Sequence, residues 1–117
     1  MIDENKYIFE PLIINGDMSS GISSVAVPVA GWNGYAVQSV FTGVPVGQLS
    51  VQLSCDLTND AASVTNWDEI GDVKAVVGAG SHTFVVRDVK WKWFRLVYTW
   101  TSGSGILNSG INFRRTY

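Results

Sequence analysis

The stretch that decides the fold is WKWFRLVYTW, residues 91–100, which is followed at once by the turn-forming sequence TSGSG at 101–105. Five of these ten residues are aromatic, a pattern typical of a strand. Successive side chains of a strand point to opposite faces, so one face carries Trp91, Trp93, Arg95, Val97 and Thr99, and the other carries Lys92, Phe94, Leu96, Tyr98 and Trp100. Because both faces are largely apolar, the strand is covered on both sides by its own fold or on one side by a neighbour.

The rest of the chain also alternates with a period of two and has almost no helical periodicity. Pro28, within the alternating run 25–30, indicates an edge strand or an extended arm. The dipeptide Asn33-Gly34 between two aromatic residues predicts a β-hairpin turn. The clearest half-buried strand is 48–55, in which we expect Leu49, Val51, Leu53 and Cys55 to face the core and Gln48, Ser50, Gln52 and Ser54 to face water.

These elements predict an all-β protein. About eight short strands, separated by turn signals at a spacing of roughly 8–12 residues, favour a single antiparallel β-sandwich or jelly-roll-like domain. A chain of 117 residues has the size of one domain. We assign residues 21–117 to the sandwich. Residues 1–20 form either an extended N-terminal arm or a first strand, since the apolar run 8–14 fits both.

Composition limits the cell compartment and the partners. Only 15% of the residues are charged and the mean hydropathy is +0.16, so part of the surface is expected to be covered by a partner. No apolar run approaches the roughly 20 residues of a membrane helix, so we expect no membrane partner. Residues 1–6 are acidic and lack a signal-peptide core, and Cys55 is alone. Folding in a reducing cytoplasm is therefore expected.

Charge is segregated along the chain. Residues 1–73 hold nine acids and one base, whereas residues 74–117 hold seven bases and one acid, so the two parts carry −8 and +6. One interpretation is that strands from both parts interleave in one domain and their charges neutralise one another. The other is a dipolar subunit that packs head to tail against copies of itself.

No residue pattern indicates catalysis, a metal or a cofactor. His82 is the only histidine and has no sequence signal of a partnered nucleophile or of further ligands. Cys55 has acids rather than activating bases nearby and is expected to be an inert thiol. The cluster Asp56, Asn59 and Asp60 matches no calcium-loop spacing and is typical of turns. We therefore predict a protein that is not an enzyme and has no catalytic residue, metal site or cofactor.

Aromatic residues offer two kinds of binding surface. The basic and aromatic stretch 90–100 has the composition of a platform for single-stranded nucleic acid, but the acidic pI of about 5.1 argues against that partner. Aromatic rings at turns or strand ends can stack on sugars in β-sandwich modules. The rings placed there are Trp32, Tyr35 and Trp67.

One set of motifs resembles a known group of proteins. The motifs are Gly47-x-Leu49-x-Val51-Gln52-x-Ser54-x-Asp56, Trp67-x-x-Ile70, Ala79-Gly80, Trp91-x-Trp93-x-Arg95-Leu96-Val97-Tyr98-Thr99 and Ser102-Gly103-Ser104-Gly105. Together they span roughly residues 45–106 and are similar to a small β-sandwich protein of tailed-bacteriophage structural gene sets. Cys55 departs from that pattern, which has a polar residue there. The element from Gln52 to Trp67 is also similar to discoidin-like jelly rolls.

The first resemblance implies a virion protein made in the host cytoplasm, either a head decoration or accessory capsid protein or a tail-associated one. Its implied partners are other virion proteins and copies of itself. The interface residues we predict are Tyr7, Phe9, Leu12, Ile14, Trp91, Trp93, Arg95, Arg114, Arg115 and Tyr117. The second resemblance implies a carbohydrate- or receptor-binding module that holds a host glycan through Trp32, Tyr35 and Trp67.

Overall fold

The computed structural model describes residues 5–29, 34–87 and 91–116. These residues form strands and one short 3-10 turn, with no α-helix among them. The elements are β1 (Asn5–Asp17), β2 (Ile22–Ser23), β3 (Val27–Pro28), β4 (Gly34–Gly43), β5 (Val46–Ser54), η1 (Ala61–Ser63), β6 (Asp68–Val77), β7 (Gly80–Arg87), β8 (Trp93–Ser102) and β9 (Gly105–Thr116).

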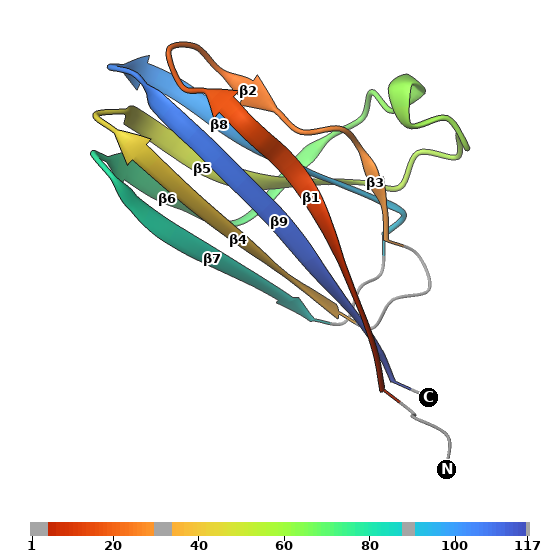
Figure 1. The fold of residues 1–117 in the computed structure, drawn as a ribbon. Helices are drawn as coiled ribbons and strands as arrows, with labels where there is room; N and C mark the ends of the chain where they lie inside the picture. The colour runs from red at the N-terminus through yellow and green to blue at the C-terminus, as the bar shows by residue number, and fades with distance from the viewer. Residues whose placement is uncertain (1–4, 30–33, 88–90, 117) are drawn as a thin grey trace.

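The strands form two antiparallel sheets packed face to face, in the orders β1-β9-β4-β7 and β2-β8-β5-β6, with β3 also paired to β8. Figure 1 shows the first sheet in front of the second. The pairings are nested: β1 pairs with β9, β2 and β3 with β8, β4 with β7, and β5 with β6. A long hairpin rolled up on itself gives this order, which is the jelly roll. The predicted β-sandwich is confirmed.

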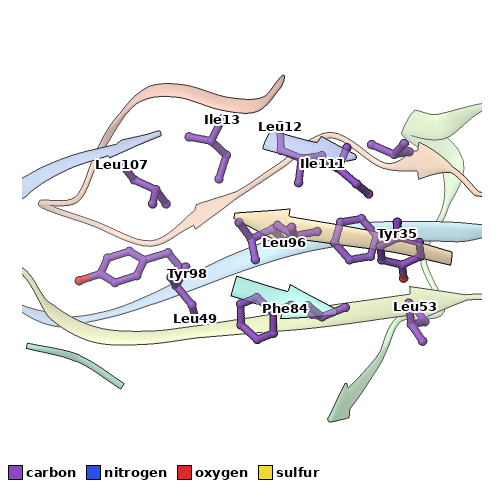
Figure 2. Packing of buried hydrophobic residues seen from close by; sticks show 14 of the residues in the cluster. Leu12, Ile13, Tyr35, Leu49, Leu53, Phe84, Leu96, Tyr98, Leu107 and Ile111 are labelled. Atoms are coloured by element: carbon purple, nitrogen blue, oxygen red, sulfur yellow. The ribbon is translucent and has the colours of Figure 1, made fainter. Parts of the chain in front are cut away.

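The aromatic stretch 91–100 supplies β8, an inner strand of the second sheet, between β5 on one side and β2 and β3 on the other. Phe94, Leu96 and Tyr98 point into the sandwich and are almost fully buried. They meet inward side chains of the opposite sheet, among them Tyr35, Leu107 and Ile111, and Figure 2 shows how these fill the space between the layers. Burial of one such large side chain contributes about 1.5–3 kcal/mol.

The N-terminal segment is a strand of the sandwich, the second of the two arrangements left open by the sequence. β1 pairs along β9, with register shifts between Pro11 and Ile13 and between Ile13 and Gly16. Pro11 is tolerated because β1 is the edge strand of its sheet. Bulges of this kind twist an edge away from further pairing.

The segment 22–28 runs along the edge of β8 as two short pieces. β2 pairs with Tyr98 and Val97, and β3 pairs with Phe94 and Trp93. Between them the Ser24 hydroxyl accepts the Leu96 amide at 2.9 Å, which continues the hydrogen bonding where the strand is interrupted. The prediction of an edge strand at Pro28 is confirmed.

The predicted hairpin at Asn33-Gly34 is wrong. Asn33 itself lies outside the described residues, but the flanking strands do not pair: β3 belongs to the second sheet and β4 to the first. The connection therefore crosses between sheets. The nested pairing places β4 between β9 and β7, so tertiary contacts override the local turn preference.

The prediction for 48–55 is correct in part on each face. Leu49, Val51 and Leu53 are buried in the core. Cys55 is exposed, because β5 ends at Ser54 and the alternation does not continue. Gln48 is exposed as expected, whereas Ser50 and Ser54 are 3% and 4% exposed rather than facing water.

Segments of the acidic and basic parts of the chain interleave in both sheets. β1 and β4 pair with β9, and β5 pairs with β8. This is the arrangement required by the first interpretation of the charge segregation.

Candidate functional site

One regular surface among the described residues is the outside of the sheet β1-β9-β4-β7, here called the outer face. Its side chains form rows across the strands, because the register aligns residues of the same orientation. The rows are Phe9, Asn112, Ala36 and Val85; Pro11, Gly110, Gln38 and Thr83; and Asn108, Val40 and Ser81. The outer face therefore mixes apolar and amide side chains.

Large apolar side chains on the outer face are open to solvent. Phe9, Val85 and Val40 are 63%, 62% and 47% exposed, and Ile14 on β1 is 69% exposed. All residues of the three rows are uncharged. The exposed Arg87 lies beyond the rows, at the end of β7. A sheet face with exposed apolar groups and no charge in its rows is typical of a surface that contacts another protein.

A shallow hollow of about 290 Å³ lies in the middle of the outer face. Its floor contains Gly110, and the ring of Phe9 lies over this glycine: a Cβ built there would be 2.5 Å from Phe9 Cζ. The rim includes Ile14, Gln38 and Val40. The absence of a side chain at position 110 thus leaves room for the Phe9 ring and creates the hollow beside that ring.

Part of the outside of the second sheet is covered by the chain itself. The segment 55–67, here called the loop, lies across it and buries Val64 and, from β8, Trp93, which is 4% exposed. Trp93 is outside the main core cluster, so it belongs to this separate layer. The apolar strand 91–100 is therefore covered on both sides, at its Trp93 end, by its own fold.

The Asp56 carboxylate ties the two ends of the loop together. Asp56 Oδ2 accepts the amides of Thr65 and Asn66 at 2.8 and 3.1 Å, and its Oδ1 accepts Asn66 Nδ2 at 2.7 Å. The Asn66 side chain, followed by the two amides, lowers the pKa of Asp56 below its usual range.

We expect the loop to open at acid pH. A carboxyl with a lowered pKa in the folded state stabilises the fold above its unfolded pKa of about 3.9, and this stabilisation is lost as pH falls through the lower folded value. Asp56→Ala should open the loop already at neutral pH, seen as faster hydrogen exchange of the Thr65 and Asn66 amides. Glu10→Ala, which removes an exposed carboxylate from β1 in the other sheet, is the control and should leave both amides protected. Equal exchange in wild type and Asp56→Ala would contradict this role.

The predicted interface residues fall in different environments. Phe9 and Ile14 lie exposed on the outer face, whereas Leu12 is 8% exposed and belongs to the core. Trp93 is buried under the loop, and Trp91 is packed against the core with its Nε1 donating to Tyr35 Oη at 3.2 Å. Accessible surfaces were expected for Leu12, Trp91 and Trp93, and that expectation is wrong for Leu12 and Trp93. The side chains of Tyr7, Arg114, Arg115 and Tyr117 lie outside the described residues.

Of the predicted glycan-binding rings, the structure describes Tyr35 and Trp67, which lie in different environments. Tyr35 is 3% exposed, and burial raises the pKa of its hydroxyl well above the usual value, so the expectation of an accessible ring is wrong there. Trp32 lies outside the described residues. Trp67 remains half-buried at the loop, where the Arg95 guanidinium lies over its ring.

Sequence reasoning missed the outer-face residues of β4, β7 and β9, chiefly Val40, Val85, Asn108 and Asn112. The sequence does contain a signal for the orientation of Val40 and Val85. Each lies an odd number of positions from an inward residue of its strand, Val37 or Phe84, and therefore points to the opposite face. Assigning the face they share requires the pairing of strands 70 residues apart, which no local pattern provides.

Residues with catalytic or ligating chemistry are scattered. Within the described part of the chain no three His, Cys, Asp or Glu side chains gather as metal ligands would. His82 Nε2 lies 2.6 Å from the Ala75 carbonyl, so it links β7 to the edge of β6. Asp60 caps η1 through Ala62 N at 3.2 Å, which is a turn role. The described residues contain no helix long and apolar enough to cross a bilayer.

Comparison with known proteins shows the fold. The sequence matches no protein-family profile and no curated protein. Among solved structures, PirA is similar with a TM-score of 0.53 at 12% identity, over 97% of this chain and 95% of PirA. A chain from the structure of the infectious bursal disease virus Gx strain is similar with a TM-score of 0.53 at 5% identity, over 97% of this chain and 32% of that one. At these identities the likeness extends to the fold alone.

Proposed function

We propose that this protein is a non-enzymatic structural subunit of a virion, a head decoration or accessory capsid protein or a tail-associated one, that docks through its outer face. The observation that carries the proposal is the set of uncharged rows with exposed Phe9, Ile14, Val40 and Val85. The fold is compatible with this role, because jelly rolls build viral capsid domains and a chain of a virus structure shares the fold.

The occupant of the outer face is a neighbouring copy of the same chain. Identical faces repel one another when they carry like charges, and the three rows named above carry none, with Arg87 beyond them at the end of β7. Amide side chains such as Gln38, Asn108 and Asn112 both donate and accept hydrogen bonds, so they can pair with the same residue types on a copy. A two-fold contact of the face with itself is therefore chemically self-complementary.

The size of the outer face predicts that one contact is too weak to hold two copies together and that repeated contacts in a lattice are needed. Four strands about 4.8 Å apart, over about seven residues at about 3.4 Å each, give roughly 450 Å² in projection. Stable complexes bury about 800 Å² per partner. One such contact alone should therefore be weak, and repeated contacts on a particle would raise the overall affinity.

The proposal predicts weak self-association that one charge abolishes. In sedimentation velocity, the weight-average mass of the wild type should rise with concentration towards that of a dimer. Val40→Lys places an unpaired charge in the middle of the contact and should weaken association by about tenfold or more.

The matched control is Val77→Lys. Val77 is 78% exposed on β6, in the other sheet, so the same substitution adds the same charge away from the outer face. It should associate like the wild type. Equal association of all three proteins, or a wild type that stays monomeric at millimolar concentration, would contradict docking of the outer face to itself.

A further inference from the structure

Arg95 is held in a fixed orientation on the outside of the second sheet. It stands directly opposite Gln52 in the β5–β8 register, and its Nε donates to Gln52 Oε1 at 2.7 Å. Its guanidinium carbon lies 4.4 Å from the centroid of the Trp67 ring. A hydrogen bond at one edge and a ring against the flat face together fix the plane of the guanidinium.

This leaves the other end of the guanidinium unused. No further hydrogen bond or ion pair involves Arg95 within the described residues, so its two Nη groups have no protein partner there. Partial burial lowers the pKa of Arg95, yet an arginine stays charged at neutral pH. A fixed charge with unused donors is a ready site for an anion of planar shape.

Arg95 lines a cleft of about 450 Å³ between the loop and the segment 24–26. This volume is in the range of small-molecule sites, about 300–1,000 Å³. Its other walls are small or apolar: Val25, Ala26, Ala61, Ala62 and Val64. Asp60 also borders the cleft, but its carboxylate is occupied by Ala62 N at 3.2 Å and Ser63 Oγ at 2.8 Å.

We propose that this cleft binds an acidic sugar, whose carboxylate pairs with the Nη groups of Arg95 and whose ring lies against the small apolar walls and Trp67. A bidentate carboxylate matches the fork of a guanidinium, and the cleft admits one sugar residue rather than a protein surface. The Arg95 cleft lies on the sheet opposite the one that carries the outer face, so sugar binding there is a separate property from docking. The sugar-binding proposal and the docking proposal can therefore fail independently of each other.

The test is titration of the full chain with sodium D-glucuronate, followed by calorimetry and by the NMR signal of the Trp67 indole N–H. We expect binding with a shift of that signal, and much weaker binding of D-glucose, which lacks the carboxylate. Arg95→Lys keeps the charge but loses the fork and should weaken binding by about tenfold or more. Lys74→Gln removes a base on β6 that lies over Phe84 and does not line the cleft, and it should change nothing.

A second variant keeps the test valid if Arg95→Lys does not fold. Ala62→Phe fills the cleft from the exposed η1 turn and leaves Arg95 in place, and it should also abolish binding. The proposal is overturned if glucuronate does not bind the wild type, if either variant binds it unchanged, or if acetate binds as tightly as glucuronate.

Discussion

Phe94→Ala is expected to lower the free energy of unfolding by about 3–5 kcal/mol, the range for removal of a buried phenyl ring. Phe94 is 0% exposed and lies between the two sheets, with its ring centroid 4.9 Å from that of Tyr35. Tyr35 in turn contacts the rings of Trp91 and Phe113, so the loss leaves a cavity at the centre of an aromatic cluster.

Thermal and urea unfolding followed by circular dichroism measure this effect. A domain has only about 5–15 kcal/mol of stability, so we expect the melting temperature of Phe94→Ala to fall by roughly 10–20 °C. Phe9→Ala is the matched control, because Phe9 is 63% exposed, and it should stay within about 1 kcal/mol of the wild type. Equal losses at both positions would contradict the placement of Phe94 in the core.

Gly47→Ala is expected to destabilise the second sheet by about 1–3 kcal/mol or more through overpacking. A Cβ on Gly47 would lie 2.8 Å from Tyr98 Oη and 2.9 Å from Tyr98 Cε1, and closer still to the Thr99 carbonyl oxygen. The oxygen belongs to the paired strand β8 and Tyr98 is 1% exposed, so neither can move away cheaply.

Gly80→Ala is the control for this prediction. A Cβ on Gly80 meets only the Phe41 ring at 3.4 Å, an ordinary contact, so the change should be close to neutral. The two variants remove the same backbone freedom and differ only in the space available. If Gly80→Ala were as destabilising as Gly47→Ala, the loss would not depend on the space available at each site, and the close approach of β5 to β8 would not explain it.

The sequence allowed the fold class to be predicted because alternation and turn spacing are local properties. The inward residues Leu49, Val51 and Leu53 follow from one strand alone. The hairpin at Asn33 failed for the opposite reason, since the partners of β4 lie in β7 and β9, far along the chain. Cys55 failed because alternation does not reveal where a strand ends.

The candidate sites were harder to predict than the fold. Phe9 and Ile14 could be proposed as surface residues, but the outer face depends on β4, β7 and β9 being neighbours. Trp93 and Arg95 looked equivalent in sequence, being two residues apart on one face of β8. The loop buries the indole of Trp93 and leaves the Nη groups of Arg95 free, a difference set by a tertiary contact that no strand pattern encodes.

The most direct test of the central proposal, that the chain is a particle subunit docked through its outer face, is a cryo-electron microscopy reconstruction of particles purified from cells that express the gene. The account predicts density for this jelly roll in symmetric copies, with Phe9, Val40 and Val85 covered by a neighbouring copy. Particles that lack the protein, or that hold it with this face turned to solvent, would contradict the account.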